Sequence, residues 1–140
     1  MEPAGYDPRV LKGMGLGYAT SDRGACHLRA TFYKPELSGM SDPADANNKA
    51  ELFIDFEDRL TIFDSLVLCR FFRDLYPWEQ LSEILKMVTG EIFDHNRLSE
   101  VATRIADLVR RFNLREGMSP NTDRLPKQLH RRLTDSGKVT

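Results

Sequence analysis

The chain has 140 residues, of which 41% are hydrophobic and 29% charged, a composition typical of a globular protein. No apolar run approaches the ~18 residues of a membrane-spanning helix, so insertion into a membrane is excluded. The 20 basic and 21 acidic residues give a net charge of -1, which offers no global field for attracting nucleic acid. The amino-terminal sequence has neither the basic start nor the apolar stretch of a secretory signal, which predicts a cytoplasmic protein.

A chain of this length fits one domain with a buried core. We expect a glycine-rich site segment in residues 1–43, a helical core in 44–117 and a partly flexible tail in 118–140. The two cysteines, Cys26 and Cys69, cannot supply the four thiolates of an iron-sulfur cluster or of the usual zinc site. Any metal centre therefore needs further ligands from elsewhere.

Residues 13–30 form the most unusual stretch, Gly-Met-Gly-Leu-Gly-Tyr-Ala-Thr-Ser-Asp-Arg-Gly-Ala-Cys-His-Leu-Arg-Ala. The alternating Gly13, Gly15 and Gly17 allow the backbone to approach another backbone or the phosphate of a ligand. A close helix contact or a flexible turn explains the same glycines, and both interpretations stay open. Residues 28–33 could form a short extended piece.

The first amphipathic helix is expected between residues 46 and 60, with Asp42 or Asp45 as its cap. Its apolar positions are Ala46, Ala50, Phe53, Ile54 and Leu60. The next stretch, residues 60–72, is apolar on nearly every side. It predicts either a buried helix or a helix that breaks inside the protein.

Two further helices have clear ends. Pro77 suits a first helical position, which predicts a helix that begins there and that Gly90 stops. Its apolar stripe is Trp78, Leu81, Ile84, Leu85 and Val88. A longer stripe over residues 98–112 predicts the strongest helix in the chain, followed by Gly117 and Pro120. It consists of Leu98, Val101, Ala102, Ile105, Leu108, Val109 and Phe112.

No segment alternates like a half-buried strand over more than a few residues, so the expected fold class is all-α, as one irregular helical domain. Residues 126–133 could form a short helical turn. The last residues of the tail lack apolar side chains to anchor them, which predicts a mobile end.

Three side chains are candidates for chemistry. The imidazole of His27 can exchange a proton near neutral pH, although a lone histidine is more often a hydrogen-bonded core residue. Asp64 and Cys69 are five residues apart, which separates them by roughly 140° on an unbroken helix. They suit two adjacent groups, because a carboxylate accepts hydrogen bonds from the N–H groups of a ligand and a thiolate binds iron. A helix cap and a small buried hydrophobe are the alternative roles.

Two motifs carry a resemblance to a known family. The run Asp64-Ser-Leu-Val-Leu-Cys69 and the run from Tyr18 to His27 resemble segments in the C-terminal region of the tungsten-dependent aldehyde ferredoxin oxidoreductases. Residues 7–9 and 112–117 also resemble family landmarks. The similarity therefore runs from about residue 5 to about residue 130, and it implies an α-helical domain of that type.

The resemblance assigns roles to individual residues. It implies that Asp64 binds the pterin of a tungstopterin or molybdopterin cofactor and that Cys69 is the last ligand of a four-iron four-sulfur (4Fe-4S) cluster. His27 takes the position of the histidine that passes a proton near the metal. The remaining candidates for binding the cofactor are Leu68, Arg29 and Arg70. Val67 stands where the family motif has glycine.

The resemblance also implies an activity for the complete enzyme, which would oxidise an aldehyde to a carboxylate and pass electrons through the cluster to ferredoxin. Its partners would be the remaining domains of the same enzyme, ferredoxin and the aldehyde. The family's β-rich domain, three clustered cysteines, first Asp motif and a glutamate near the metal have no counterpart in this chain. We therefore expect the isolated chain to be an inactive part of a larger enzyme, without a stably bound cofactor.

The alternative is a non-catalytic helical interaction module that uses the basic residues of the tail, Lys127, His130, Arg131, Arg132 and Lys138. The two interpretations differ in their exposed apolar surface. A domain of a larger enzyme should leave the face with Gly15, His27, Asp64 and Cys69 uncovered and tend to form a homodimer, whereas a self-contained module would cover or polarise that face.

Overall fold

The computed structural model describes residues 4–133, which contain helices and no strand, so the prediction of an all-α fold is confirmed. The α-helices are α1 (Lys12–Thr20), α2 (Tyr33–Leu37), α3 (Lys49–Ser65), α4 (Trp78–Thr89) and α5 (His95–Arg115). The short 3-10 helices are η1 (Arg70–Phe72), η2 (Pro120–Thr122) and η3 (Lys127–His130). The last of these forms the helical turn expected in the tail. No described helix is both long and apolar enough to span a bilayer.

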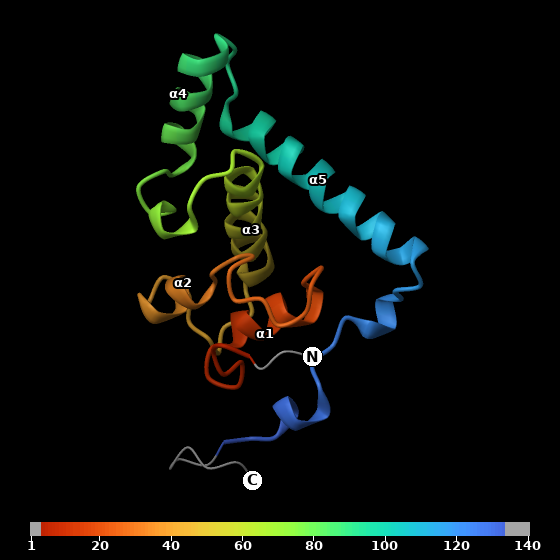
Figure 1. The fold of residues 1–140 in the computed structure, drawn as a ribbon. Helices are drawn as coiled ribbons and strands as arrows, with labels where there is room; N and C mark the ends of the chain where they lie inside the picture. Colours follow the sequence, from red (N-terminus) through yellow and green to blue (C-terminus); the bar gives the residue numbers. More distant parts are fainter. Residues whose placement is uncertain (1–3, 134–140) are drawn as a thin grey trace.

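Helix α3 is the axis of the molecule, with α1 and α2 beside its first half and α4 and α5 beside its second half (Figure 1). Two clusters of buried side chains follow this division. Phe53 of α3 packs with α1 and Phe32 in the first cluster. Leu60 and Phe63 of α3 pack with residues of α4 and α5, including Leu81, in the second. One helix therefore connects both cores.

The glycines of the amino-terminal segment lie on α1, where the sequence shows no helical period. A Cβ atom on Gly13 would lie 2.1 Å from Cδ1 of the Phe32 ring, and one on Gly17 would lie 3.2 Å from Cε2 of Phe53. The glycines thus replace the apolar stripe that usually identifies an amphipathic helix, because aromatic side chains from other elements pack directly on their backbone. Of the two interpretations of these glycines, the close helix contact is confirmed.

Two local predictions are wrong. Residues 28–32 form turns and bends instead of an extended piece, and α2 begins at residue 33. Neither Asp42 nor Asp45 caps α3, because the helix begins only after Asn48, which has a positive φ of 54°. The two carboxylates instead accept the backbone N–H groups two residues further along, each at 2.8 Å, in local turns.

The apolar stretch after residue 60 is a broken helix, which was one of the two predicted forms. Helix α3 ends at residue 65, and η1 begins five residues later. Val67 lies in this break with a φ of 57°, which reverses the direction of the backbone. The segment is not a buried helix, because Val67 is 90% exposed and Phe71 is fully on the surface.

The ends of α4 and α5 follow the sequence signals closely. Pro77 is the cap residue directly before α4, one position earlier than expected, and Gly90 ends the helix with a φ of 78°. Asp94 caps α5 by accepting the backbone N–H of Arg97 at 2.9 Å. Gly117, with a φ of 97°, follows the end of α5.

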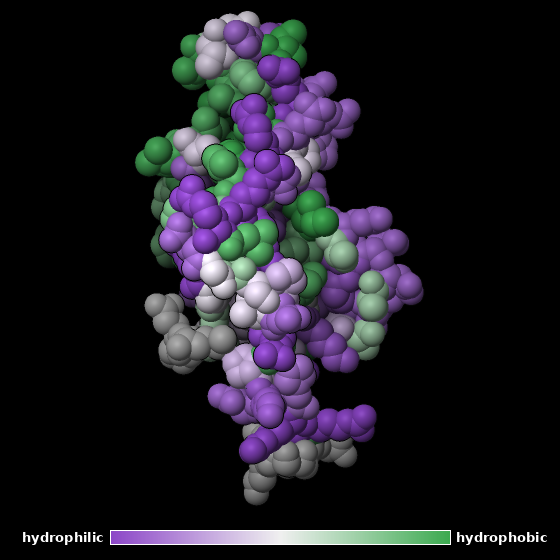
Figure 2. All heavy atoms as spheres, turned by 90° about the vertical axis from the view of Figure 1, so that its right-hand side faces the viewer, coloured by the Kyte–Doolittle hydropathy of each residue, from purple (hydrophilic) through white to green (hydrophobic). Residues whose placement is uncertain are grey.

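The apolar stripe of α5 is covered only over its first half. Leu98 and Ala102 are buried against α3 and α4, whereas Leu108 is 69% exposed and Phe112 is 54% exposed. Figure 2 shows the mostly hydrophilic face that carries α5, with hydrophobic residues interspersed and gathered towards its upper end. The mobile end that we expected for residues 134–140 lies outside the described residues.

Candidate functional site

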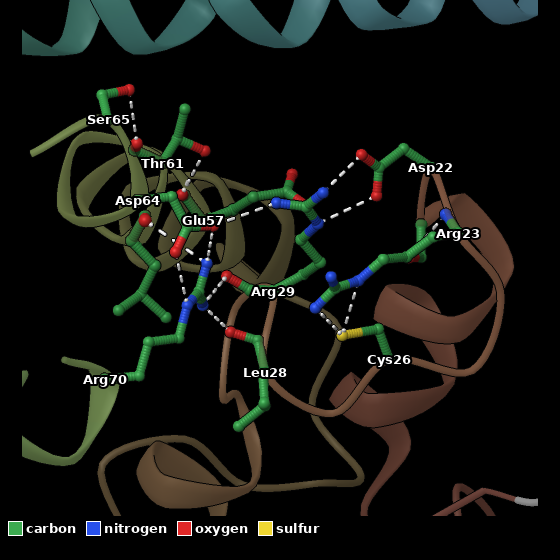
Figure 3. A network of polar contacts seen from close by, with 12 residues as sticks. Asp22, Arg23, Cys26, Leu28, Arg29, Glu57, Thr61, Asp64, Ser65 and Arg70 are labelled. Carbon is green, nitrogen blue, oxygen red and sulfur yellow. Dashed lines mark hydrogen bonds and ion pairs between the residues drawn. The ribbon is translucent and has the colours of Figure 1, made fainter. Parts of the chain in front are cut away.

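The candidate site joins three segments: the α1–α2 loop, the end of α3 and the residues up to η1 (Figure 3). The loop supplies Arg29 and the α3 end supplies Asp64. Arg70 enters from η1. The structure therefore brings together three of the residues that the sequence singled out, although they are up to 41 positions apart.

Asp64 is the centre of this network because two guanidinium groups bind its carboxylate. Arg70 donates from Nε to Oδ1 at 2.9 Å and from Nη2 to Oδ2. Arg29 donates from Nη1 to Oδ2 at 3.1 Å. Oδ2 thus accepts two hydrogen bonds and Oδ1 accepts one, which leaves acceptor capacity on Oδ1. The side chain is 41% exposed, so a ligand N–H group can reach it.

Arg70 also holds the backbone of the loop. Its Nη1 donates to the carbonyl oxygens of Leu28 and, at 3.3 Å, of Arg29. Its Nη2 reaches the carbonyl of Leu60 at 3.4 Å. The Arg70 side chain is only 13% exposed, and its guanidinium is used for contacts within the protein. This position disfavours a direct contact between its guanidinium and a cofactor.

Asp22 completes the network and was not recognised as a site residue from the sequence. It binds Arg29 in a bidentate pair, with Nε–Oδ1 at 2.8 Å and Nη2–Oδ2 at 2.6 Å. Bidentate pairing fixes the orientation of a guanidinium as well as its charge. Arg29 is therefore held between two carboxylates, Asp22 and Asp64. An acidic residue seven positions before an arginine in a loop is too common a pattern to have predicted this pair.

Cys69 lies just before η1 in an extended conformation, and its side chain is a free, exposed thiol. The adjacent Leu68 is half-buried against the second core cluster, and its backbone N–H donates to the carbonyl of Phe63 at 3.0 Å. Among residues 4–133 no group of three or more His, Cys, Asp or Glu side chains is suited to a metal ion. Cys69 can thus offer one ligand to a metal centre but cannot build one.

His27 takes no part in the ion-pair network around Asp64. Its ring packs against Tyr6, with centroids 5.8 Å apart and planes at 61°. The neighbouring Cys26 accepts hydrogen bonds from Arg23, at 3.3 Å from Nε and 3.1 Å from Nη2. These contacts raise the pKa of the Arg23 guanidinium above its usual value. The loop thus carries both His27, which contacts Tyr6, and the Asp22–Arg29 pair, which contacts Asp64.

A cleft of about 230 Å³ lies next to this network, between the α1–α2 loop, α3 and α5. Glu57 of α3 lines it together with Asp22 and Arg29. Burial raises the pKa of the Glu57 carboxyl, and the charges of Asp58 and Asp22 raise it further, while Arg29 lowers it. Glu57 was not recognised from the sequence, because an acidic residue on an amphipathic helix is usually on its solvent-exposed side.

The predicted uncovered face is confirmed only in part. Asp64 and Cys69 are exposed and His27 is half-buried, but Gly15 is buried within the contacts of α1. Exposed apolar side chains flank Cys69 in the sequence instead. They are Val67, Phe71, Phe72 and Leu75.

Comparisons with known proteins agree with the two motifs. The family model described as "Aldehyde ferredoxin oxidoreductase, domains 2 & 3" matches residues 1–140. The chain is 35% identical over 133 residues to a tungsten-containing aldehyde ferredoxin oxidoreductase of Pyrococcus furiosus, covering 91% of this chain and 22% of the relative. It is 34% identical over 133 residues to the protein of the same name in Thermococcus kodakarensis, with the same coverage. The chain thus spans about a fifth of the length of these relatives.

Proposed function

The chain belongs to the aldehyde ferredoxin oxidoreductase family, and from this premise we propose that it acts as the C-terminal part of an enzyme that oxidises aldehydes to carboxylates. The electrons would pass through a 4Fe-4S cluster to ferredoxin. The observation that carries the proposal is the match of the family model to the whole chain. The names of the curated relatives, which are tungsten-containing enzymes, support it.

The role proposed for Asp64 is to bind the pterin of a tungstopterin or molybdopterin cofactor. The free acceptor capacity of Oδ1 and the exposure of the carboxylate fit a ligand that presents N–H groups. Arg29 and Arg70 fix the direction of the Asp64 carboxylate, because each donates a hydrogen bond to it. Arg29 is a candidate for a direct cofactor contact. Leu68 can offer a cofactor only its side chain and its carbonyl, because its backbone N–H donates to the carbonyl of Phe63.

The role proposed for Cys69 is to bind one iron of the cluster through its thiolate. Its exposure on the extended segment before η1 fits a ligand that projects from the protein surface towards a group held mainly by other parts of the enzyme. Within the described part of the chain no other cysteine lies beside it, because Cys26 is held in the loop by Arg23. The isolated chain is therefore expected to be inactive.

His27 is proposed to exchange a proton during the reaction. Oxidation of an aldehyde with water to a carboxylate releases two electrons and three protons, so a group that accepts protons near the substrate is required. When bound, the metal-pterin cofactor supplies the two-electron chemistry and the cluster carries the electrons onward. The share of this chain is to hold the cofactor, to hold one iron and to move a proton.

The first test uses the complete enzyme that contains this segment, purified without oxygen as wild type and as Cys69→Ser and Asp64→Asn. We expect Cys69→Ser to lose the cluster, measured as iron content and as the electron paramagnetic resonance signal of the reduced cluster. Asp64→Asn should lower the tungsten or molybdenum content, measured by mass spectrometry. Both variants should oxidise aldehydes at least about 100-fold more slowly than wild type.

Cys26→Ser is the matched control, because it removes the other thiol without touching the proposed ligand. It should keep the iron content and the turnover of the wild type. Full iron content and full turnover in Cys69→Ser would contradict the proposal. So would aldehyde oxidation by the 140-residue chain alone, expressed anaerobically with tungstate.

The second candidate function is a non-catalytic helical interaction module. The exposed apolar side chains of α5 count against it, because a self-contained module would cover or polarise such a surface. The basic tail weighs little in its favour, because in residues 127–133 the charges lie on a short exposed 3-10 turn and the two residues after it. Normal cofactor content and turnover in all the variants above would favour this alternative.

A further inference from the structure

Asp22 belongs to the network around Asp64 but is connected to it only through Arg29 (Figure 3). Its carboxylate accepts hydrogen bonds from Nε and Nη2 of Arg29, at 2.8 and 2.6 Å, along one edge of the guanidinium. The third nitrogen, Nη1, donates to Oδ2 of Asp64 at 3.1 Å. Because a guanidinium is planar and rigid, the two bonds to Asp22 fix the angle at which Nη1 reaches Asp64.

This angle leaves the contact between Arg29 and Asp64 incomplete. Arg70 binds Asp64 through two parallel donors, Nε and Nη2. Among residues 4–133, Arg29 gives Asp64 a single bond, and its Nη2 binds Asp22 instead. A carboxylate has about four acceptor sites, so these three hydrogen bonds leave one site open on Asp64. A second bond from Arg29 would fill it.

The backbone beside Arg29 is held independently of Asp22. Arg70 donates from Nη1 to the carbonyl oxygens of Leu28 and, at 3.3 Å, of Arg29. Removal of Asp22 should therefore free the Arg29 side chain while the loop stays in place. The freed guanidinium lies next to a carboxylate that it already contacts. We expect it to turn and to bind both oxygens of Asp64, because the bidentate arrangement is the stronger one.

We propose that Asp22 is a positioning residue that holds Arg29 in its single contact with Asp64, so that one acceptor site of Asp64 stays open for an N–H group of the pterin. The inference rests on the role proposed for Asp64, and it adds the residue that keeps this carboxylate accessible. It follows that the loss of Asp22 impairs cofactor binding only while residue 29 carries a guanidinium.

The test compares the complete enzyme, purified without oxygen, as wild type, Asp22→Ala, Arg29→Lys and the double variant Asp22→Ala with Arg29→Lys. In Asp22→Ala we expect the tungsten or molybdenum content, measured by mass spectrometry, to fall by about tenfold, which is typical when a residue behind a metal site is lost. The double variant should recover to within about twofold of Arg29→Lys, because lysine keeps the charge but lacks the planar fork.

Asp123→Ala is the matched control. Asp123 binds Arg110 in a bidentate pair of the same kind, and its side chain is 25% exposed, compared with 27% for Asp22. The control removes an equal charge and an equal ion pair outside the network, so it should keep the metal content of the wild type. Circular dichroism checks that each variant is folded. If Asp22→Ala does not fold, Asp22→Asn takes its place, because it keeps the size of the side chain.

The inference is overturned if Asp22→Ala keeps the metal content of the wild type. It is also overturned if the double variant holds no more metal than Asp22→Ala, since Asp22 would then not act through the guanidinium of Arg29.

Asp64→Asn, prepared in the same way, separates these outcomes from a failure of the proposed function. If Asp64→Asn loses metal but Asp22→Ala does not, Asp64 binds the cofactor and the inference about Asp22 is wrong. If Asp64→Asn keeps its full metal content, the role proposed for Asp64 is wrong, and the inference that depends on it is overturned as well.

Discussion

Val67 is a β-branched residue in the left-handed backbone region, with a φ of 57°. This conformation costs about 1–2 kcal/mol for a side chain with a Cβ, and nothing packs on Val67 to offset the cost, since it is 90% exposed. The strain lies between Asp64 and Cys69, at the position where the resembled motif has glycine. The left-handed backbone conformation at this position is thus adopted here by valine, without the glycine that would favour it.

Val67→Gly should therefore stabilise the chain by about 1 kcal/mol, because relief of the strain exceeds the added freedom of the unfolded chain. Urea unfolding followed by circular dichroism measures the change. Val88→Gly is the control, because Val88 is also mostly exposed, at 79%, but lies in α4. It should destabilise by about 0.5 kcal/mol, since glycine disfavours a helix. Equal destabilisation by both variants would show that position 67 is not strained.

At the residue scale the sequence allowed the candidates to be chosen by their chemistry but did not predict their contacts. Asp64 and Cys69 stand out as a carboxylate and a thiol at a fixed spacing. The pairing of Asp64 with Arg29 joins residues 35 positions apart, and only the tertiary fold brings them together. Asp22 and Glu57 were missed for the same reason, because the former is defined by its partner and the latter by its burial.

Helix α1 shows how an element is formed by contacts that the sequence does not reveal. Its glycines give no apolar period, and the aromatic rings that pack on them come from Phe32 and Phe53. Helices α4 and α5 were predictable because their own residues mark their ends, including Gly90 and Gly117. Local capping is readable in a sequence, whereas packing against a bare backbone depends on distant residues.

Gly13→Ala should destabilise the chain by at least about 2 kcal/mol, because its Cβ would overlap with the Phe32 ring at 2.1 Å. This cost outweighs the gain of about 1 kcal/mol that alanine normally brings to a helix. The melting temperature and the urea midpoint report the change. Lys12→Ala is the control, since Lys12 is the exposed neighbour on α1, and it should stay within about 0.5 kcal/mol of the wild type. A neutral Gly13→Ala would mean that Phe32 can move away.

Considered as a whole, the described part of the molecule has two well-covered cores and, besides them, uncovered apolar side chains. One set of these flanks Cys69 in the sequence at the α3–η1 break, and another lies on the second half of α5, with Leu108 and Phe112. Uncovered apolar side chains that continue a buried stripe indicate a surface that is normally covered. The chain spans about a fifth of the length of its relatives. We therefore propose that other parts of the same enzyme pack on these apolar side chains.

The chain alone should then self-associate through these surfaces, and Leu108→Glu with Phe112→Glu should shift it towards monomer. Both positions are more than half exposed, so the free energy of unfolding should change by no more than about 0.5 kcal/mol per site. Sedimentation velocity over a wide range of concentrations measures the association.

Thr103→Glu with Ala106→Glu is the charge-matched control, because it adds the same two negative charges to exposed positions of α5 and keeps Leu108 and Phe112. If the control variant reduces self-association as much as Leu108→Glu with Phe112→Glu, then net charge and not the apolar surface governs the association. A wild type that stays monomeric at every concentration would mean that these side chains are tolerated in water. The interpretation as a self-contained helical module would then gain support.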